Sequence, residues 1–268
     1  MSSLSGTPPR SALLAAWGNA WLAGDTGLPE LVARVTAYDD LHSVTGLAVD
    51  DLPLERAVAR LRAAGVTRLR VVLPAPGDAV GLPGPGPFTS AALQASEGVL
   101  ALRADGMGTG LVPTLVSHGS AYDGTVTTVT WATWDVVATA PDPSPYLHDA
   151  EHDLRRGLLE CIGALRDLDV ARWRPDVAEA LADLRSAARR GLEADELPDG
   201  YSTRARDLLV QARSLAGVLQ LAGADTGGAV DTREAAGREA ALRELGRLVR
   251  RARLAAYNSY GQLDRDRS

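Results

Sequence analysis

The feature that most constrains the fold is a repeat of apolar residues in the second half of the chain. In four segments, apolar side chains recur at alternating spacings of four and three residues. An average spacing of 3.5 places these side chains on one stripe of a helix, as in helices that pack side by side. Because short connections separate the segments, we expect an antiparallel four-helix bundle. The segments are 154–168, 177–188, 208–222 and 242–256.

The first half of the chain has other periods. Three short helices are expected in its first 65 residues: Ser11 can cap the first, Pro29 begins the second, and the third follows Asp51. From Val66 to residue 138, four runs rich in β-branched and aromatic residues alternate with glycine-containing links, which predicts an antiparallel β-meander. Pro113 lies inside the third run and indicates a sheet edge or a bulge at that point.

The fold class that these patterns predict is α+β. N-terminal helices and a small antiparallel β-meander are followed by a C-terminal antiparallel four-helix bundle. We expect two domains, an α+β domain with an antiparallel sheet over residues 1–140 and a helical bundle domain over residues 141–268. The proline-rich stretch at 141–145 separates them.

The absence of lysine excludes several chemistries. All 28 basic residues are arginine, so Schiff-base catalysis, a lysine-anchored pyridoxal phosphate, a Walker A loop and Ser-x-x-Lys acyl enzymes are excluded. The single cysteine, Cys161, excludes an intrachain disulfide and multi-cysteine zinc sites. It lies among apolar helix positions and is expected to be a buried, unreactive thiol. The composition indicates no cofactor.

The charge balance and codon bias bear on partners and location. A formal net charge of −6 gives no overall attraction to nucleic acid or to anionic membranes. The rarity of residues with AT-rich codons indicates a GC-rich bacterial genome, so the many arginines need not recognise phosphate. No apolar run reaches the roughly 18 residues of a membrane span, and no secretory signal is visible. We therefore expect a cytoplasmic protein, with nucleic acid an unlikely partner and no membrane association.

One short stretch has the spacing of a metal site. His148, Glu151 and His152 fit H-x-x-E-H, in which inverted zinc peptidases use the two histidines as metal ligands. The stretch also opens a bundle helix, where Asp149 and Asp153 favour the positive end of the helix dipole. On a helical wheel both histidines point sideways or away from the apolar stripe. The sequence therefore favours a helix start and leaves the metal site as the alternative.

Three aromatic residues are candidates for binding. Trp131 and Trp134 lie on opposite faces of their strand, because an odd separation reverses the side-chain direction. One is expected in the core, and the other packs between elements, lines a groove or contacts a partner. Phe88 ends a loop rich in proline and glycine, which is either a rigid connection or a binding loop beside the sheet.

The sequence favours a non-enzymatic binding or protein-interaction module with a protein partner or self-association. Ser117 and His118 lie in a turn and indicate a hairpin rather than a nucleophile with its base. The alternative is a metal-dependent hydrolase, which would use His148, Glu151 and His152 or a pocket between the Pro/Gly loop and the sheet. No class of small-molecule ligand is indicated.

Overall fold

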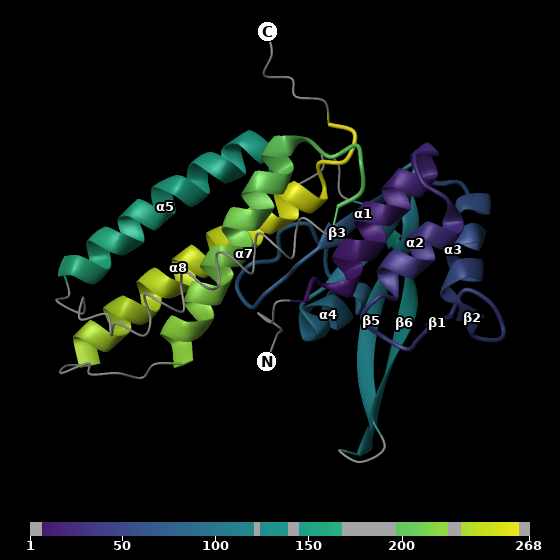
Figure 1. Ribbon diagram of the computed structural model, residues 1–268, viewed down its shortest axis with the longest axis horizontal. Helices are drawn as coiled ribbons and strands as arrows, with labels where there is room; N and C mark the ends of the chain where they lie inside the picture. The colour runs from purple at the N-terminus through teal and green to yellow at the C-terminus, as the bar shows by residue number, and fades with distance from the viewer. Residues whose placement is uncertain (1–6, 121–123, 139–144, 168–196, 225–231, 263–268) are drawn as a thin grey trace, which may run out of the picture.

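The computed structural model describes residues 7–120, 124–138, 145–167, 197–224 and 232–262. The described residues form an α+β fold, in which a six-stranded sheet with four helices is followed by a helical region (Figure 1). The strands are β1 (Leu41–Thr45), β2 (Leu52–Pro53), β3 (Val66–Val72), β4 (Gly98–Arg103), β5 (Met107–Ser120) and β6 (Gly124–Val137). The helices are α1 (Arg10–Ala23), α2 (Leu28–Val35), α3 (Leu54–Ala63), α4 (Pro87–Ala95), α5 (Leu147–Asp167), α7 (Thr203–Ala224) and α8 (Thr232–Tyr257).

The sheet is mixed, with the order β2-β1-β6-β5-β4-β3. Strands β3 to β6 pair as the antiparallel meander that the sequence predicts. The expectation of a purely antiparallel sheet is wrong, however, because β1 pairs with β6 in parallel and β2 adds an antiparallel edge. Strand β1 is five residues long, and its partner is more than 80 positions away in sequence, with Leu41 opposite Thr128. So short a strand carries too few alternating positions to be distinguished from a loop.

The two faces of the sheet are covered differently. The face that includes Val99 and Ala101 of β4 packs on α1, α2 and α3. The alternate residues Leu100 and Leu102 pack with Phe88 of α4 on the other face. Helix α4 was not predicted, because the Pro/Gly-rich loop that leads into it suggested an irregular connection over its whole length. The Phe88 ring of α4 packs tightly on the sheet, since a Cβ built on Gly110 of β5 would lie 2.3 Å from it.

The C-terminal region contains three helices in its described residues. Helix α8 packs along both α5 and α7. Their shared core includes positions from the predicted apolar stripes, among them Leu154 of α5, Leu208 of α7 and Leu245 of α8. Helices α5 and α8 approach closely because Gly157 has no side chain: a Cβ there would lie 2.1 Å from Leu248 Cδ1. The predicted helix at 177–188 lies outside the described residues.

The core of the sheet region extends into the C-terminal helices. The buried cluster of α1 and of the sheet face that α1, α2 and α3 cover also contains Tyr201, Leu209, Leu254 and Tyr257. The hydroxyl of Tyr201 donates a 2.7 Å hydrogen bond to the Tyr257 carbonyl, which joins the segment before α7 to the end of α8. The N-terminal and C-terminal regions therefore share one hydrophobic core.

The outer edge of the sheet at β3 is covered by two asparagine side chains. Asn19 of α1 donates to the carbonyl oxygen of Leu69 and accepts from its N–H, both at 2.7 Å. Asn258, directly after α8, makes the same pair of bonds to Val71, at 3.0 and 2.9 Å. Leu69 and Val71 are two residues apart, so their backbone groups point to the same edge of the strand. These are the only two asparagines in the sequence.

The start of α1 differs from the expectation in detail. Ser11 lies within the first turn and does not cap the helix, which Pro9 precedes without a side-chain cap. Instead, Glu97, directly before β4, accepts hydrogen bonds from the N–H and the hydroxyl of Ser11, at 2.9 and 2.7 Å. A carboxylate at this position satisfies an N–H that the helix leaves without a partner and favours the dipole.

Candidate functional site

A chain of buried polar side chains crosses the layer between the helices and the sheet. The carboxylate of Asp39, which follows α2, accepts two 2.6 Å hydrogen bonds from Arg10 at the start of α1. It also lies 3.1 Å from Nε2 of His42 in β1. The other ring nitrogen, Nδ1, accepts a 3.2 Å hydrogen bond from the indole of Trp131 in β6. The chain therefore ties α1, the segment after α2, and the parallel pair β1–β6 together.

The partners of His42 fix its protonation. An indole N–H can only donate, so Nδ1 must be an acceptor and the single proton lies on Nε2, facing Asp39. Burial lowers the pKa of His42 below its ordinary value of 6.5, although the hydrogen bond and charge of Asp39 raise it. The side chain is 1% exposed. A second proton would break the bond to Trp131, so the folded protein favours the neutral ring.

This arrangement has only part of a catalytic constellation. A carboxylate that orients a histidine is how hydrolases build a general base. Here the remaining nitrogen is occupied by Trp131, which has no proton to lose near neutral pH, and the histidine is buried. The physical role that fits is attachment of β1 to β6. Sequence reasoning missed His42 because nothing in the local sequence indicates which residue lies across the strand from it.

The three aromatic candidates occupy the core or its margin. Trp131 is fully buried on the face that α1, α2 and α3 cover, and Phe88 is 2% exposed on the face that α4 covers. Trp134 is half-buried and stands edge-on to Phe88, with ring centroids 6.4 Å apart. The predicted placement of the two tryptophans on opposite faces is confirmed by the cores to which they belong. None of the three presents a fully open aromatic surface.

The H-x-x-E-H stretch lies in the first turns of α5. His148 and His152 are exposed, and Glu151 is half-buried. Glu151 accepts hydrogen bonds from Arg155, at 3.0 Å, and from Arg204 of α7, at 2.8 Å. Arg204 also lies 3.2 Å from Nδ1 of His148. Within the described part of the chain, no three His, Cys, Asp or Glu residues are grouped closely enough to hold a metal ion. These contacts of Arg204 therefore join α5 to α7.

The Pro/Gly-rich loop between β3 and α4 is anchored on α8. Asp78 is buried and accepts hydrogen bonds from Arg250, at 3.0 Å, and Arg251, at 3.2 Å. Burial opposes ionisation of this carboxyl, but the two arginines outweigh it and hold its pKa below the ordinary value.

Cys161 is buried as expected, and burial raises the pKa of its thiol.

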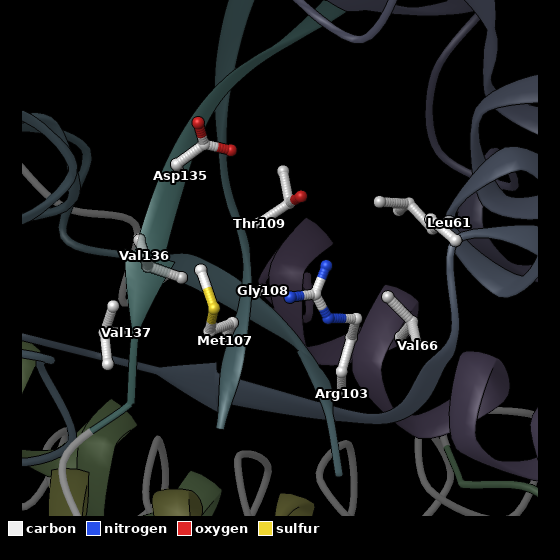
Figure 2. Close-up of a pocket in the computed structure, with 10 residues that line it drawn as sticks. Leu61, Val66, Arg103, Met107, Gly108, Thr109, Asp135, Val136 and Val137 are labelled. Carbon is white, nitrogen blue, oxygen red and sulfur yellow. The ribbon is translucent and has the colours of Figure 1, made fainter. Parts of the chain in front are cut away.

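A cavity of about 210 Å³ lies at one end of the sheet (Figure 2). Leu61 and Val66 form an apolar wall opposite Thr109 and Asp135, which are cross-strand partners on β5 and β6. Arg103 of β4 lies between the two sides and is already paired with Asp105, 3.1 Å away. The lining contains no histidine, cysteine or serine. The cavity is large enough for a small molecule, and Thr109 and Asp135 are the hydroxyl and the carboxylate in its lining.

The β5–β6 hairpin projects beyond the rest of the sheet (Figure 1). Both strands have 14 residues, but β4 pairs with β5 only as far as Leu111, and β1 pairs with β6 only from Thr128 onward. Residues 112–120 and 124–127 therefore extend past their neighbours. Pro113 lies just beyond the last residue paired with β4, so the predicted sheet edge at Pro113 is confirmed.

One part of the sheet carries an uncharged surface, which we call the open face. It lies on β1, β5 and β6, on the side opposite α1–α3 and past the part that α4 covers. Three of its apolar side chains are strongly exposed: Leu41 at 59%, Val116 at 42% and Val126 at 49%. His118 lies opposite Val126 at its outer end. The open face consists of Leu41, Ser43, Thr45, Thr114, Val116, Val126, Thr128 and Thr130.

Comparison with known proteins decides the family. Residues 11–146 match a family model described as Rv1486c-like protein, N-terminal domain. Residues 148–254 match the model of the corresponding C-terminal domain. The chain belongs to the Rv1486c-like family. The two matched regions meet directly before α5, and their side chains share the core that includes α1 and α8.

The family has relatives in mycobacteria. The chain is 27% identical over 285 residues to "Uncharacterized protein Rv1486c" of Mycobacterium tuberculosis, covering 92% of this chain and 95% of the relative. It is 28% identical over 290 residues to "Uncharacterized protein ML1804" of Mycobacterium leprae, covering 93% and 96%. No solved structure matches the chain. Among the described helices of this Rv1486c-like protein, none is long and apolar enough to cross a membrane.

The buried state of His42 predicts a pH dependence of stability. Because its pKa is lowered in the folded protein, the unfolded chain binds a proton first as the pH falls below 6.5. This contribution to stability is fully present above that pH and is lost as the pH falls toward the folded pKa, by at most about 1.4 kcal/mol per pH unit. We expect the free energy of unfolding, measured with urea, to fall more steeply between pH 7.5 and 5.5 for the wild type than for His42→Asn.

The exposed His118 supplies the control for this prediction. His118→Asn should keep the pH dependence of the wild type, since His118 lies on the surface of the hairpin. Identical pH dependence in the wild type and in both variants would mean that His42 titrates as it does in the unfolded chain. That result would contradict the assignment of a buried, neutral ring.

Proposed function

We propose that this Rv1486c-like protein is a non-enzymatic, cytoplasmic protein-interaction module, and that it binds its partner through the open face and the projecting hairpin. The observation that carries the proposal is the exposure of Leu41, Val116 and Val126 on one uncharged surface. Apolar side chains gathered on a sheet surface mark sites of protein contact more often than scattered ones do. A hairpin that extends past its sheet gives a partner two faces and an edge to bind.

The chemistry of the described polar groups supports a binding role. Asp39 and His42 form the strongest candidate for a general base, and Trp131 closes that arrangement to substrate. Asp78 and Glu151 each accept hydrogen bonds from two arginines, so their charges serve to join elements. The cavity contains the carboxylate of Asp135 and the hydroxyl of Thr109, but its lining has no histidine, cysteine or serine. Asp39, His42, Asp78 and Glu151 thus each have a structural use that competes with a catalytic one.

Two substitutions in β6 test this proposal as a matched pair. Val126→Glu places a charge on the open face, whereas Val137→Glu places the same charge at the far end of the strand, on an exposed site of the opposite face. We expect the immobilised wild type and Val137→Glu to retain the same protein from a lysate of the source bacterium, and Val126→Glu to retain at least tenfold less, because burying a charge without a partner is costly.

The retained protein must then bind the purified chain again with the same ranking of variants, measured by titration calorimetry. A second copy of the chain counts as a partner in this experiment. If all three proteins retain the same material, or if none retains any while all three are folded by circular dichroism, the open face is not an interaction surface and the proposal is overturned.

The alternative function is a metal-dependent hydrolase that uses His148, Glu151 and His152. The observation that favours it is their placement on consecutive turns of α5, with both histidines exposed to solvent. Metal analysis of untagged protein by mass spectrometry tests it. The hydrolase predicts about one equivalent of zinc that is lost in the His148→Ala/His152→Ala variant. The interaction proposal predicts no stoichiometric metal in either protein.

A further inference from the structure

Resting on the proposed function, we infer that the partner of the open face is a second copy of this chain. Two open faces would pack against each other across a two-fold axis, as the two sheets of a β-sandwich do, about 10 Å apart. Each copy would contribute the same residues, centred on Val116 and Val126. The inference rests on the charge, the chemistry and the edges of the surface.

Charge favours self-association at this surface. None of the eight residues of the open face is charged, whereas Asp, Glu and Arg make up 23% of the chain and give it a net charge of −6. Two copies of a chain with this net charge repel each other on average. Contact through an uncharged surface places no like charges opposite each other. Recognition of a different, charged partner would instead favour complementary charges on the surface, and the open face has none.

The side-chain chemistry of the open face is compatible with itself. It consists of threonines and one serine around Leu41, Val116 and Val126. In a two-fold contact both copies contribute the same residues, and a residue that lies on the axis meets its own copy. Threonine hydroxyls both donate and accept hydrogen bonds, and threonine pairs stabilise sheet contacts. A flat surface of such residues can therefore pack on its own copy without leaving a charge or a one-sided donor buried.

The edges of the sheet direct association to this end of the molecule. At β3, Asn19 and Asn258 satisfy the outward backbone groups, so a second chain cannot add a strand there without displacing both side chains. At the hairpin, β5 from Val112 to Ser120 pairs with β6, and no described strand pairs with its other edge. The surface available for contact between copies is therefore the open face together with the hairpin that extends it.

The size of the open face sets the expected affinity. Three strands spaced about 4.8 Å apart and paired over about 20 Å give a flat area of roughly 300 Å². This is less than the ~800 Å² per partner of a standard stable interface, so the dimer is expected to be weak and to depend on concentration.

Sedimentation velocity tests this inference. We expect the weight-average sedimentation coefficient of the wild-type chain to rise from the monomer value toward that of a dimer between about 5 and 500 µM, the range of a weak interface. Val137→Glu should behave like the wild type. Val126→Glu should remain monomeric throughout. Because no charges meet in the contact, raising the salt concentration from about 0.05 to 0.5 M should not weaken the dimer.

A second variant guards against loss of folding. Leu41→Glu lies in β1, a different strand of the same face, and should also be monomeric with an unchanged circular dichroism spectrum. The inference is overturned if the wild type remains monomeric at the highest concentration. It is also overturned if Val126→Glu and Leu41→Glu both dimerise over the same concentration range as the wild type. The proposed function survives a monomeric wild type if the lysate experiment yields another protein that both variants fail to bind.

Discussion

The architecture depends on the contact between two asparagine side chains and the outer edge of β3. An amide side chain offers an N–H donor beside a carbonyl acceptor, as a backbone peptide does, so it can pair with an edge residue as a neighbouring strand would. Asn19 and Asn258 occupy alternate outward positions, at Leu69 and Val71. Each bond contributes about 1 kcal/mol, but a buried backbone group that loses its partner costs about 1–3 kcal/mol. Two residues 239 positions apart thus hold the first and last described helices to one strand.

This contact explains why the two regions matched by separate family models share a core. Asn258 follows α8 directly, so its bonds to Val71 place the end of that helix beside the sheet, where Leu254 and Tyr257 join the buried cluster of α1. The Asp78 ion pairs with Arg250 and Arg251 add a second attachment through the Pro/Gly-rich loop. These contacts close one edge of the sheet, while β5 and β6 at its centre extend beyond their neighbours.

Sequence patterns identified the elements whose periodicity is long and regular. The apolar stripes around Leu154, Leu208 and Leu245, and the runs that form β3 to β6, were found because local pattern and tertiary burial agree. Strand β1 and helix α4 were missed, because a five-residue strand beside a distant partner and a helix after a proline-rich loop have weak local signals. The His42–Trp131 pair and the asparagine contacts depend on residues far apart in sequence. The presence of just two asparagines was visible in the sequence, but their common target was not.

Residue-resolved hydrogen exchange of the Leu69 and Val71 amides tests the central claim most directly. In the wild type both amides should be protected nearly to the level of global unfolding, although they lie on a sheet edge. In Asn258→Ala the Val71 amide should exchange roughly 30-fold faster, corresponding to about 2 kcal/mol, relative to Leu69, whose bond to Asn19 remains. Rapid exchange of Val71 in the wild type, or equal acceleration of both amides in the variant, would contradict the proposed role of these asparagines.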